Sequence, residues 1–159
     1  DSMCRRHGWP CDTLDLKFET LPADDVLSER LSISPGTPIV RVSRVKVSGK
    51  TRIAYVEDYF PADLVSIDEI RSGFKGSVLD FFIERGTPRI DYARTDITAL
   101  LAGKTLGKKL AIPEDAMLLL AQETLFSDQG EPFAYSDNYM LMEFFKFHIV
   151  RRVPGDVRA

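Results

Sequence analysis

The alternation of hydrophobic and polar residues is most regular between Ile39 and Pro61. Two runs rich in β-branched and aromatic residues, 39–47 and 52–60, flank a short polar turn that contains Gly49. Such runs joined by a glycine-containing turn are typical of a β-hairpin. The sequence therefore predicts two antiparallel strands here.

Successive side chains of a strand point to opposite faces, so alternate residues share a face. One face of the first strand begins apolar and ends with two cations: Val40, Val42, Arg44 and Lys46. One face of the second mixes aromatic rings with a carboxylate: Ile53, Tyr55, Glu57 and Tyr59. Faces of this kind suit a pocket for a small polar ligand, although an amphipathic hairpin with its charged end in water shows the same pattern.

The hairpin occurs a second time, in residues 118–140. The tyrosines and the carboxylate recur 80 residues later: Tyr55, Glu57 and Tyr59 correspond to Tyr135, Asp137 and Tyr139. Upstream, apolar positions match at an offset of 79 residues: Ala23, Leu27, Leu31 and Ile33 correspond to Ala102, Leu106, Leu110 and Ile112. Two copies at so long a period indicate a duplicated unit of strand, short helix, strand and strand.

Periodicity and turn residues predict the remaining elements. We expect strands over 14–21, 89–100 and 143–150, and helices over 23–31, 62–70, 77–85 and 104–110. Ser77 can cap the third of these helices, with Asp80 completing a capping box. Hairpins combined with a few short helices define an α+β fold with an antiparallel sheet.

Composition limits the classes of function. With 159 residues, 44% hydrophobic and 28% charged, the chain can bury one good core and form one domain. Its formal net charge of −3 argues against direct binding of nucleic acid, and no apolar run approaches the roughly 20 residues that span a membrane. Cys4, His7 and Cys11 offer three metal ligands without a fourth nearby, so we expect no metal and reduced cysteines, with a local disulfide as the alternative.

No catalytic machinery is recognisable. Glycine-rich phosphate loops are missing, and the two histidines, His7 and His148, belong to no nucleophile–base arrangement. Glu57 and Asp137 are the one carboxylate pair that the repeat places symmetrically. We therefore assign no catalytic residue. Ser77 at a helix start, with Arg44 and Lys46 nearby, could form an anion site, although a simple helix cap would look the same.

The order and spacing of several short motifs resemble the UTRA domain, the effector-binding half of GntR-type transcriptional regulators of the HutC subfamily. The motifs are Leu31-x-Ile33-x-x-Gly36-x-Pro38, Arg44-x-Lys46-x-x-Gly49, Ala54-Tyr55, Tyr59-x-Pro61, Gly76-Ser77-Val78-Leu79, Asp128-x-Gly130-x-Pro132 and Tyr135-Ser136. The resemblance covers residues 14–150.

This resemblance implies a chorismate-lyase-like fold, a sensor function without a cofactor, homodimerisation, a cytoplasmic location and no membrane partner. It also implies DNA binding only through an N-terminal winged helix-turn-helix domain, which this sequence does not contain. We therefore expect a fragment, with residues 1–13 as the end of a linker, 14–150 as the ligand-binding and dimerisation domain and 151–159 as a tail.

Members of the family usually hold a small anionic metabolite, often a sugar phosphate, through an Arg-x-Arg pair and a serine that begins a helix. These positions correspond to Arg44, Lys46 and Ser77. Lys46 replaces an arginine, Leu79 stands where sugar-phosphate binders often have tyrosine, and Tyr55 and Tyr135 stand where amino-sugar binders tend to have glutamate. A carboxylate effector is therefore as plausible as a sugar phosphate.

The leading hypothesis is a non-catalytic sensor that controls DNA binding allosterically. Arg44, Lys46 and Ser77 would bind the charged group of the effector, and its body would contact residues of both hairpins: Tyr55, Glu57, Tyr135, Asp137 and Tyr139. One alternative is a chorismate-lyase-like enzyme acting on a small aromatic or enol-ether acid. Another is a dimerisation module with a vestigial pocket.

Overall fold

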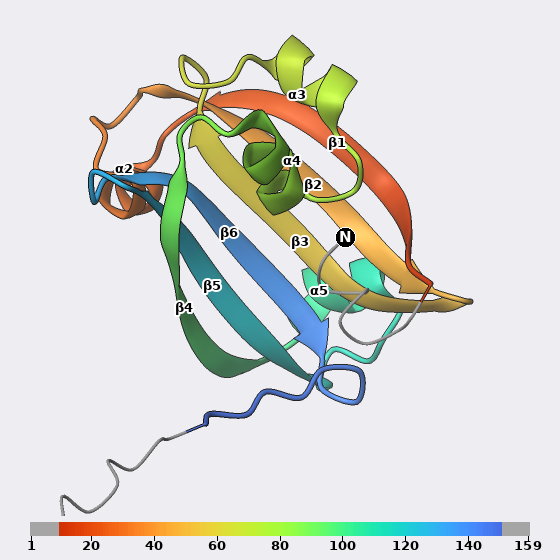
Figure 1. Ribbon diagram of the computed structural model, residues 1–159. Helices are drawn as coiled ribbons and strands as arrows, with labels where there is room; N and C mark the ends of the chain where they lie inside the picture. The colour runs from red at the N-terminus through yellow and green to blue at the C-terminus, as the bar shows by residue number, and fades with distance from the viewer. Residues whose placement is uncertain (1–9, 151–159) are drawn as a thin grey trace, which may run out of the picture.

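One antiparallel sheet of six strands forms the frame of the protein in a computed structural model that describes residues 10–150 (Figure 1). The strands are β1 (Asp12–Pro22), β2 (Pro38–Ser48), β3 (Thr51–Pro61), β4 (Ile90–Leu101), β5 (Met117–Ser127) and β6 (Pro132–Leu141). They lie in the order β1-β2-β3-β6-β5-β4, and every neighbouring pair is antiparallel. The expected α+β class is confirmed.

Four helices of the described chain pack on this sheet: α2 (Asp25–Leu31), α3 (Ile67–Gly73), α4 (Val78–Arg85) and α5 (Gly103–Leu110). Their positions agree with the predicted helices to within a few residues. Ser77 caps α4, since its Oγ accepts a hydrogen bond of 3.1 Å from the backbone N–H of Asp80. Gly86 ends α4 in the left-handed conformation, with φ of +72°, which glycine adopts at little cost.

The duplication seen in the sequence is present in the structure. The units β1-α2-β2-β3 and β4-α5-β5-β6 have the same order of elements, and they meet where β3 pairs with β6 in the middle of the sheet. The equivalent residues Glu57 and Asp137 lie opposite one another across this junction, and on either side of them Tyr55 lies opposite Tyr139 and Tyr59 opposite Tyr135. Helices α3 and α4 lie between the copies in the sequence and belong to neither.

The two faces of the sheet carry different residues and different helices. We call the one that contains Val42, Arg44, Asp58 and Ser136 the α4 face, and the one that contains Tyr55, Glu57, Tyr135 and Asp137 the tyrosine face. In Figure 1 helices α3 and α4 lie in front of the sheet, over the α4 face, whereas α2 and α5 lie behind it. Each of these last two covers one end of the tyrosine face, α2 over Tyr59 and Tyr135 and α5 over Tyr55 and Tyr139.

Aromatic packing fixes α4 to the sheet. Phe82 is fully buried and makes edge-to-face contacts with Phe60 of β3 and Phe133 of β6, at ring-centroid distances of 5.5 and 5.1 Å. Burial of such a side chain stabilises the fold by about 1.5–3 kcal/mol. The same contacts set the position of the start of α4 above β2 and β3.

Two expectations about the ends of the described chain are wrong. Residues 143–150 form no strand: the chain leaves β6 in a turn, and only Phe145 of the predicted strand is buried. Ile149 is 97% exposed. Since β6 lies inside the sheet between β3 and β5, the chain that leaves it has no free edge beside it; the free edges are those of β1 and β4. Cys11 is disulfide-bonded, so the expectation of a reduced thiol is wrong there. Residues 1–9 and 151–159, which include Cys4, His7 and the expected tail, lie outside the described residues.

Candidate functional site

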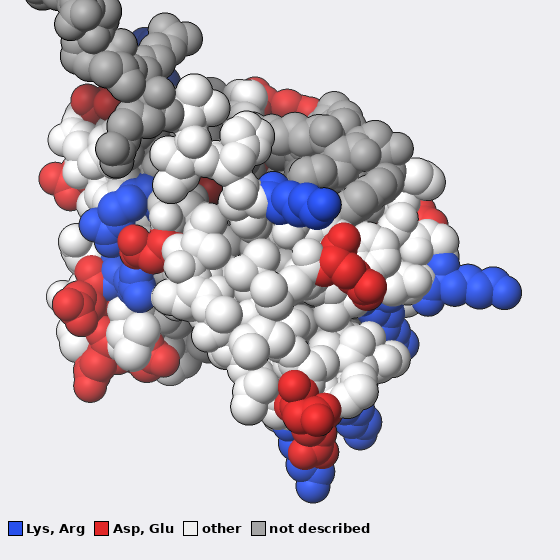
Figure 2. All heavy atoms as spheres, turned by 90° about the horizontal axis from the view of Figure 1, so that it is seen from below, with Lys and Arg blue, Asp and Glu red and all other residues white. Residues whose placement is uncertain are grey.

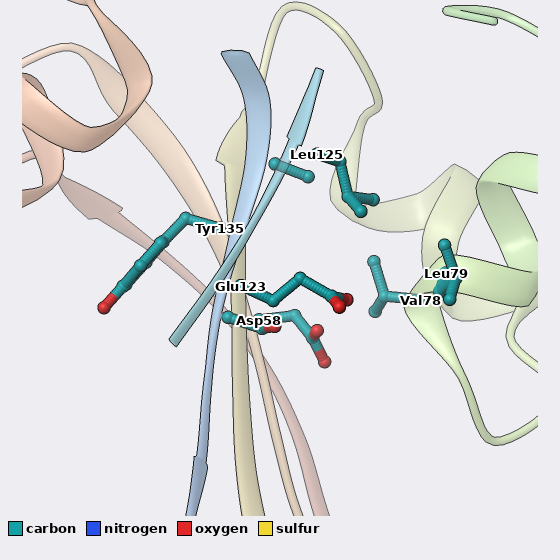
Figure 3. A pocket seen from close by; sticks show the side chains of 8 residues that line it. Asp58, Val78, Leu79, Glu123, Leu125 and Tyr135 are labelled. Atoms are coloured by element: carbon teal, nitrogen blue, oxygen red, sulfur yellow. The ribbon is translucent and has the colours of Figure 1, made fainter. Parts of the chain in front are cut away.

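The residues predicted to form one binding site lie on opposite faces of the sheet. Arg44 and Lys46 are on the α4 face. The other strand residues of the predicted site are on the tyrosine face: Tyr55, Glu57, Tyr135, Asp137 and Tyr139. In Figure 3 the ring of Tyr135 points away from α4, whereas the side chains of Asp58 and Glu123 point toward it. The backbone of the sheet therefore separates the two groups that were predicted to contact one ligand.

A one-residue irregularity in the hairpin causes this separation. Next to the turn, Ser48 pairs with Thr51 and Val47 with Arg52, but Lys46 pairs with Ala54, so Ile53 has no partner. Without this bulge Lys46 would face Ile53, and Arg44 would then share a face with Tyr55. A shift of one residue moves every later side chain to the other face. It places Asp58, not Glu57, on the face of Arg44.

Arg44 is a buried cation with incomplete hydrogen bonding. Its side chain is 5% exposed, forms an ion pair with Asp58 through Nη1, and lies 5.2 Å from the centroid of the Phe74 ring. Its Nε–H is buried and has no hydrogen-bond partner. Leaving a buried charged donor unsatisfied costs about 1–3 kcal/mol or more. Such a group is a candidate for contact with a ligand.

Lys46 lies beside Arg44 on the same face and reaches the start of α4. Its amino group donates a hydrogen bond to the carbonyl oxygen of Gly76, the residue before the helix cap. Burial, followed by the positive charge of Arg44, lowers the pKa of Lys46 to about 7, although Asp58 and Asp80 oppose the shift. Lys46 therefore titrates near neutral pH, and an anion that approaches it stabilises its protonated form.

The start of α4 adds polar groups to these two cations. Ser77 is buried and uses an acceptor of its hydroxyl for the cap, which leaves the hydroxyl hydrogen available for donation. The unpaired N–H groups of the first helical turn and the helix dipole favour a negative charge at this position. The structure thus brings together three predicted site residues: Arg44, Lys46 and Ser77.

A small hollow lies between α4 and the sheet. Its empty volume is about 220 Å³, including its open mouth, and its polar lining comes from Asp58, Glu123 and Ser136. Val78 and Leu79 of α4 form the apolar wall opposite (Figure 3). The sequence analysis missed all three polar residues. The alternation of side chains could have indicated Asp58, but only with the bulge known.

The tyrosine face carries a polar network that repeats in both copies. The hydroxyl of Tyr55 donates to Glu57 Oε1 at 2.8 Å, and that of Tyr135 donates to Asp137 Oδ1 at 2.6 Å. The rings stack across the junction, Tyr55 on Tyr139 and Tyr59 on Tyr135, with centroids 6.1 and 6.2 Å apart. Each carboxylate also has a second neighbour, Arg41 for Glu57 and Gln122 for Asp137.

The environment of these tyrosines keeps them protonated. Burial, followed by the charges of Asp137 and Glu57, raises the pKa of Tyr139 to about 12. Burial also raises the pKa values of Tyr55, Tyr59 and Tyr135, and the adjacent carboxylates raise them further. Tyr55 and Tyr135 therefore donate hydrogen bonds to Glu57 and Asp137, and both carboxylates have a hydrogen-bond donor without a ligand.

Within residues 10–150, no group of three or more histidine, cysteine, aspartate or glutamate residues could hold a metal ion. None of the helices in this part of the chain is long and apolar enough to cross a membrane. On the surface shown in Figure 2, the described lysine and arginine side chains are interspersed with aspartate and glutamate and do not merge into one basic area.

Solved structures with the same fold are ligand-binding parts of transcriptional regulators. The effector domain of PhnF from Mycobacterium smegmatis superimposes with a TM-score of 0.82 at 17% sequence identity, covering 94% of this chain and 92% of that one. A GntR-family transcriptional regulator from Bacillus cereus gives a TM-score of 0.78 at 15% identity, covering 89% of this chain and 99% of that one. The fold is thus that of the effector domains of GntR-family regulators.

The sequence itself identifies the family. The family model of the UTRA domain matches residues 8–146, and the chain belongs to the UTRA domain family. The mannosyl-D-glycerate transport/metabolism system repressor MngR of Escherichia coli (strain K12) is 27% identical over 135 residues, which are 85% of this chain. The matched part is 56% of that repressor's length. Membership gives the chain a regulatory, effector-binding role.

Proposed function

We propose that this chain is a sensor domain that binds a small anionic metabolite on the α4 face of its sheet. Arg44, Lys46 and the start of α4 at Ser77 would bind the negative charge. Asp58, Glu123 and Ser136 would contact the body of the ligand in the adjacent hollow. The observation that carries the proposal is the buried, unpartnered Nε–H of Arg44, next to a second buried cation and a helix N-terminus.

Two buried cations at one place are costly for the fold. Arg44 lowers the pKa of Lys46, which shows that the two charges repel one another. The ion pair of Arg44 with Asp58 compensates one of the two positive charges. An anion would relieve the remaining repulsion and satisfy the open donor, so its binding is favoured by the arrangement of the protein.

The tyrosine face has no role in binding under this proposal. Each of its two carboxylates already accepts a hydrogen bond from a tyrosine of its own strand. We therefore assign Tyr55, Glu57, Tyr135, Asp137 and Tyr139 to the stability of the junction between the two copies. This assignment replaces their predicted contact with the effector.

The regulatory output requires more of the protein than this domain. We propose that the chain acts as a homodimer in the cytoplasm, together with an N-terminal winged helix-turn-helix domain that binds an operator. Binding of the effector would favour one arrangement of the two protomers and so change the spacing of the DNA-binding domains. MngR, whose name links it to a glycoside of glyceric acid, supports a sugar-derived anion as the kind of effector.

A thermal-shift experiment tests the binding site. The purified domain is heated with a panel of sugar phosphates, sugar acids and other small carboxylates. A ligand at 100 times its Kd adds about 2.7 kcal/mol to the free energy of unfolding, which gives an easily measured rise in Tm. No rise with any anion would contradict the proposal.

Two variants on the same strand locate the site. We expect Arg44→Gln to abolish the ligand-dependent rise in Tm. Arg41→Gln is the matched control, because Arg41 is also ion-paired, with Glu19, but lies on the tyrosine face. If Arg44→Gln unfolds, Lys46→Gln gives the same test. A normal ligand response in both α4-face variants would exclude the site.

A further inference from the structure

The surroundings of the anion site contain more formal negative charge than positive charge. Its cations are Arg44 and Lys46, and the carboxylates nearest to them are Asp58, which pairs with Arg44, and Asp80, which acts electrostatically on Lys46. Glu123 lines the adjacent hollow together with Asp58. Formally, two positive charges therefore face three negative ones, before any ligand binds.

This balance disfavours a doubly charged ligand. A phosphate monoester carries a charge of about −1.5 to −2 near pH 7, whereas a carboxylate carries −1. Burying a charge is costly unless opposite charges compensate it, and here Asp58 already uses one of the two cations. The helix dipole at Ser77 adds only about half a positive charge. What remains for a ligand, Lys46 and the helix dipole, therefore matches the single charge of a carboxylate better than the double charge of a phosphate ester.

The geometry of Arg44 also suits a carboxylate. Asp58 bonds to Nη1, and the Nε side of the guanidinium has no partner. A planar carboxylate can approach such an edge with both oxygens. The phenyl ring of Phe74 covers the guanidinium at 5.2 Å, which keeps its plane fixed.

The lining of the hollow indicates which polar groups the body of the ligand carries and how large it can be. The carboxylates of Asp58 and Glu123 accept hydrogen bonds, and the hydroxyl of Ser136 can accept or donate. A ligand that contacts them must bring donors, which means hydroxyl or ammonium groups. Val78, Leu79, Leu125 and Ala134 leave room for only a short carbon chain or ring beside these groups.

We infer that the effector is a carboxylic acid whose body carries hydroxyl or ammonium groups, and that the site discriminates against phosphate esters. Asp58 determines this specificity by its charge. The inference rests on the proposed function, because it concerns the same site on the α4 face.

Matched pairs of compounds test the preference. Glucuronate is compared with glucose 6-phosphate, and glycerate with glycerol 3-phosphate, by thermal shift and calorimetric titration at constant ionic strength. We expect the carboxylate of each responding pair to bind at least about tenfold more tightly. Tighter binding of the phosphates would overturn the inference and leave the proposed function standing. No response to either series, or to amino acids and hydroxy acids added to it, would contradict both.

A charge-neutralising variant provides the second arm. Asp58→Asn keeps the shape and a hydrogen-bond acceptor beside Arg44 but removes one negative charge. We expect it to shift the ratio of carboxylate to phosphate affinity toward phosphate by about tenfold, which corresponds to about 1.4 kcal/mol. Asp137→Asn, on the tyrosine face, is the matched control and should leave the ratio unchanged. An unchanged ratio in Asp58→Asn would overturn the role of this residue.

Discussion

The two faces of the sheet show what duplication has preserved and where it has been broken. On the tyrosine face the copies match, down to the hydrogen bond from a tyrosine to a carboxylate two residues later on the same strand. On the α4 face Arg44 and Lys46 of the first copy have no cationic counterpart, since the equivalent positions of β5 in the second copy are Glu123 and Leu125. Helix α4, which belongs to neither copy, covers only one end of that face.

This difference separates stability from binding. Groups that duplication supplies in pairs can pack against one another across the junction, as the stacked tyrosines of the tyrosine face do. A group that is present in only one copy has no equivalent group to pack against, and it can retain an unsatisfied hydrogen-bond donor, as the Nε–H of Arg44 does. In this fold the asymmetric face is therefore the place to expect a ligand.

The largest effect should follow from loosening α4 from the sheet. Phe82→Ala removes a fully buried ring that contacts both copies, and it should lower the free energy of unfolding by about 3–5 kcal/mol. It should also abolish effector binding. Ile83→Ala, at a neighbouring position that is 60% exposed, is the control and should cost less than about 0.5 kcal/mol in urea unfolding. Equal costs at the two positions would contradict this picture of α4.

Removal of single hydroxyl groups tests the symmetry of the tyrosine face. Tyr55→Phe and Tyr135→Phe each delete a hydrogen bond to a carboxylate, at an expected cost of about 1.5–3 kcal/mol. Because the two bonds occupy equivalent positions, the two costs should be similar in denaturant unfolding. Neither variant should change effector affinity, and a loss of affinity in either would place the binding site on this face.

The pKa of Lys46 predicts a pH dependence specific to the α4 face. This pKa is about 7 in the folded protein, whereas an unperturbed lysine, as in the unfolded chain, has a pKa of 10.5. Between these values the unfolded chain binds more protons, so the free energy of unfolding rises with pH. Lys46→Met removes this contribution. Between pH 7 and pH 9 the wild type should gain about 1–2 kcal/mol relative to the variant. A difference in stability that is the same at both pH values would refute the lowered pKa.

The smallest effect distinguishes a helix cap from a binding residue. Ser66 and Ser77 cap α3 and α4 with equivalent hydrogen bonds, to the N–H groups of Glu69 and Asp80. Alanine at either position should lower stability by about 1 kcal/mol. Only Ser77→Ala should also weaken effector binding in calorimetric titration. An unchanged affinity would reduce Ser77 to a cap.

Local patterns were sufficient for most of the fold. The strand periodicity, the internal repeat and the cap at Ser77 predicted the six strands, the four helices and the two hairpins. The site was only half predictable, because membership of a face depends on the register of the hairpin. The bulge at Ile53 shifts that register by one residue, and no local pattern marks it. The predicted last strand was wrong: Phe147 and Ile149 alternate with polar residues as strand residues do, but the chain that leaves β6 has no free edge beside it.

The junction between β3 and β6 is the shortest pairing in the sheet, running only from Ala54 opposite Met140 to Tyr59 opposite Tyr135. Mechanically it is a seam that joins two otherwise complete units. The hollow crosses this seam, since Asp58 belongs to β3, Ser136 to β6 and Glu123 to β5. A bound effector would contact both units at this seam. Occupancy of the hollow would therefore increase the stiffness of the junction between the two halves of the domain.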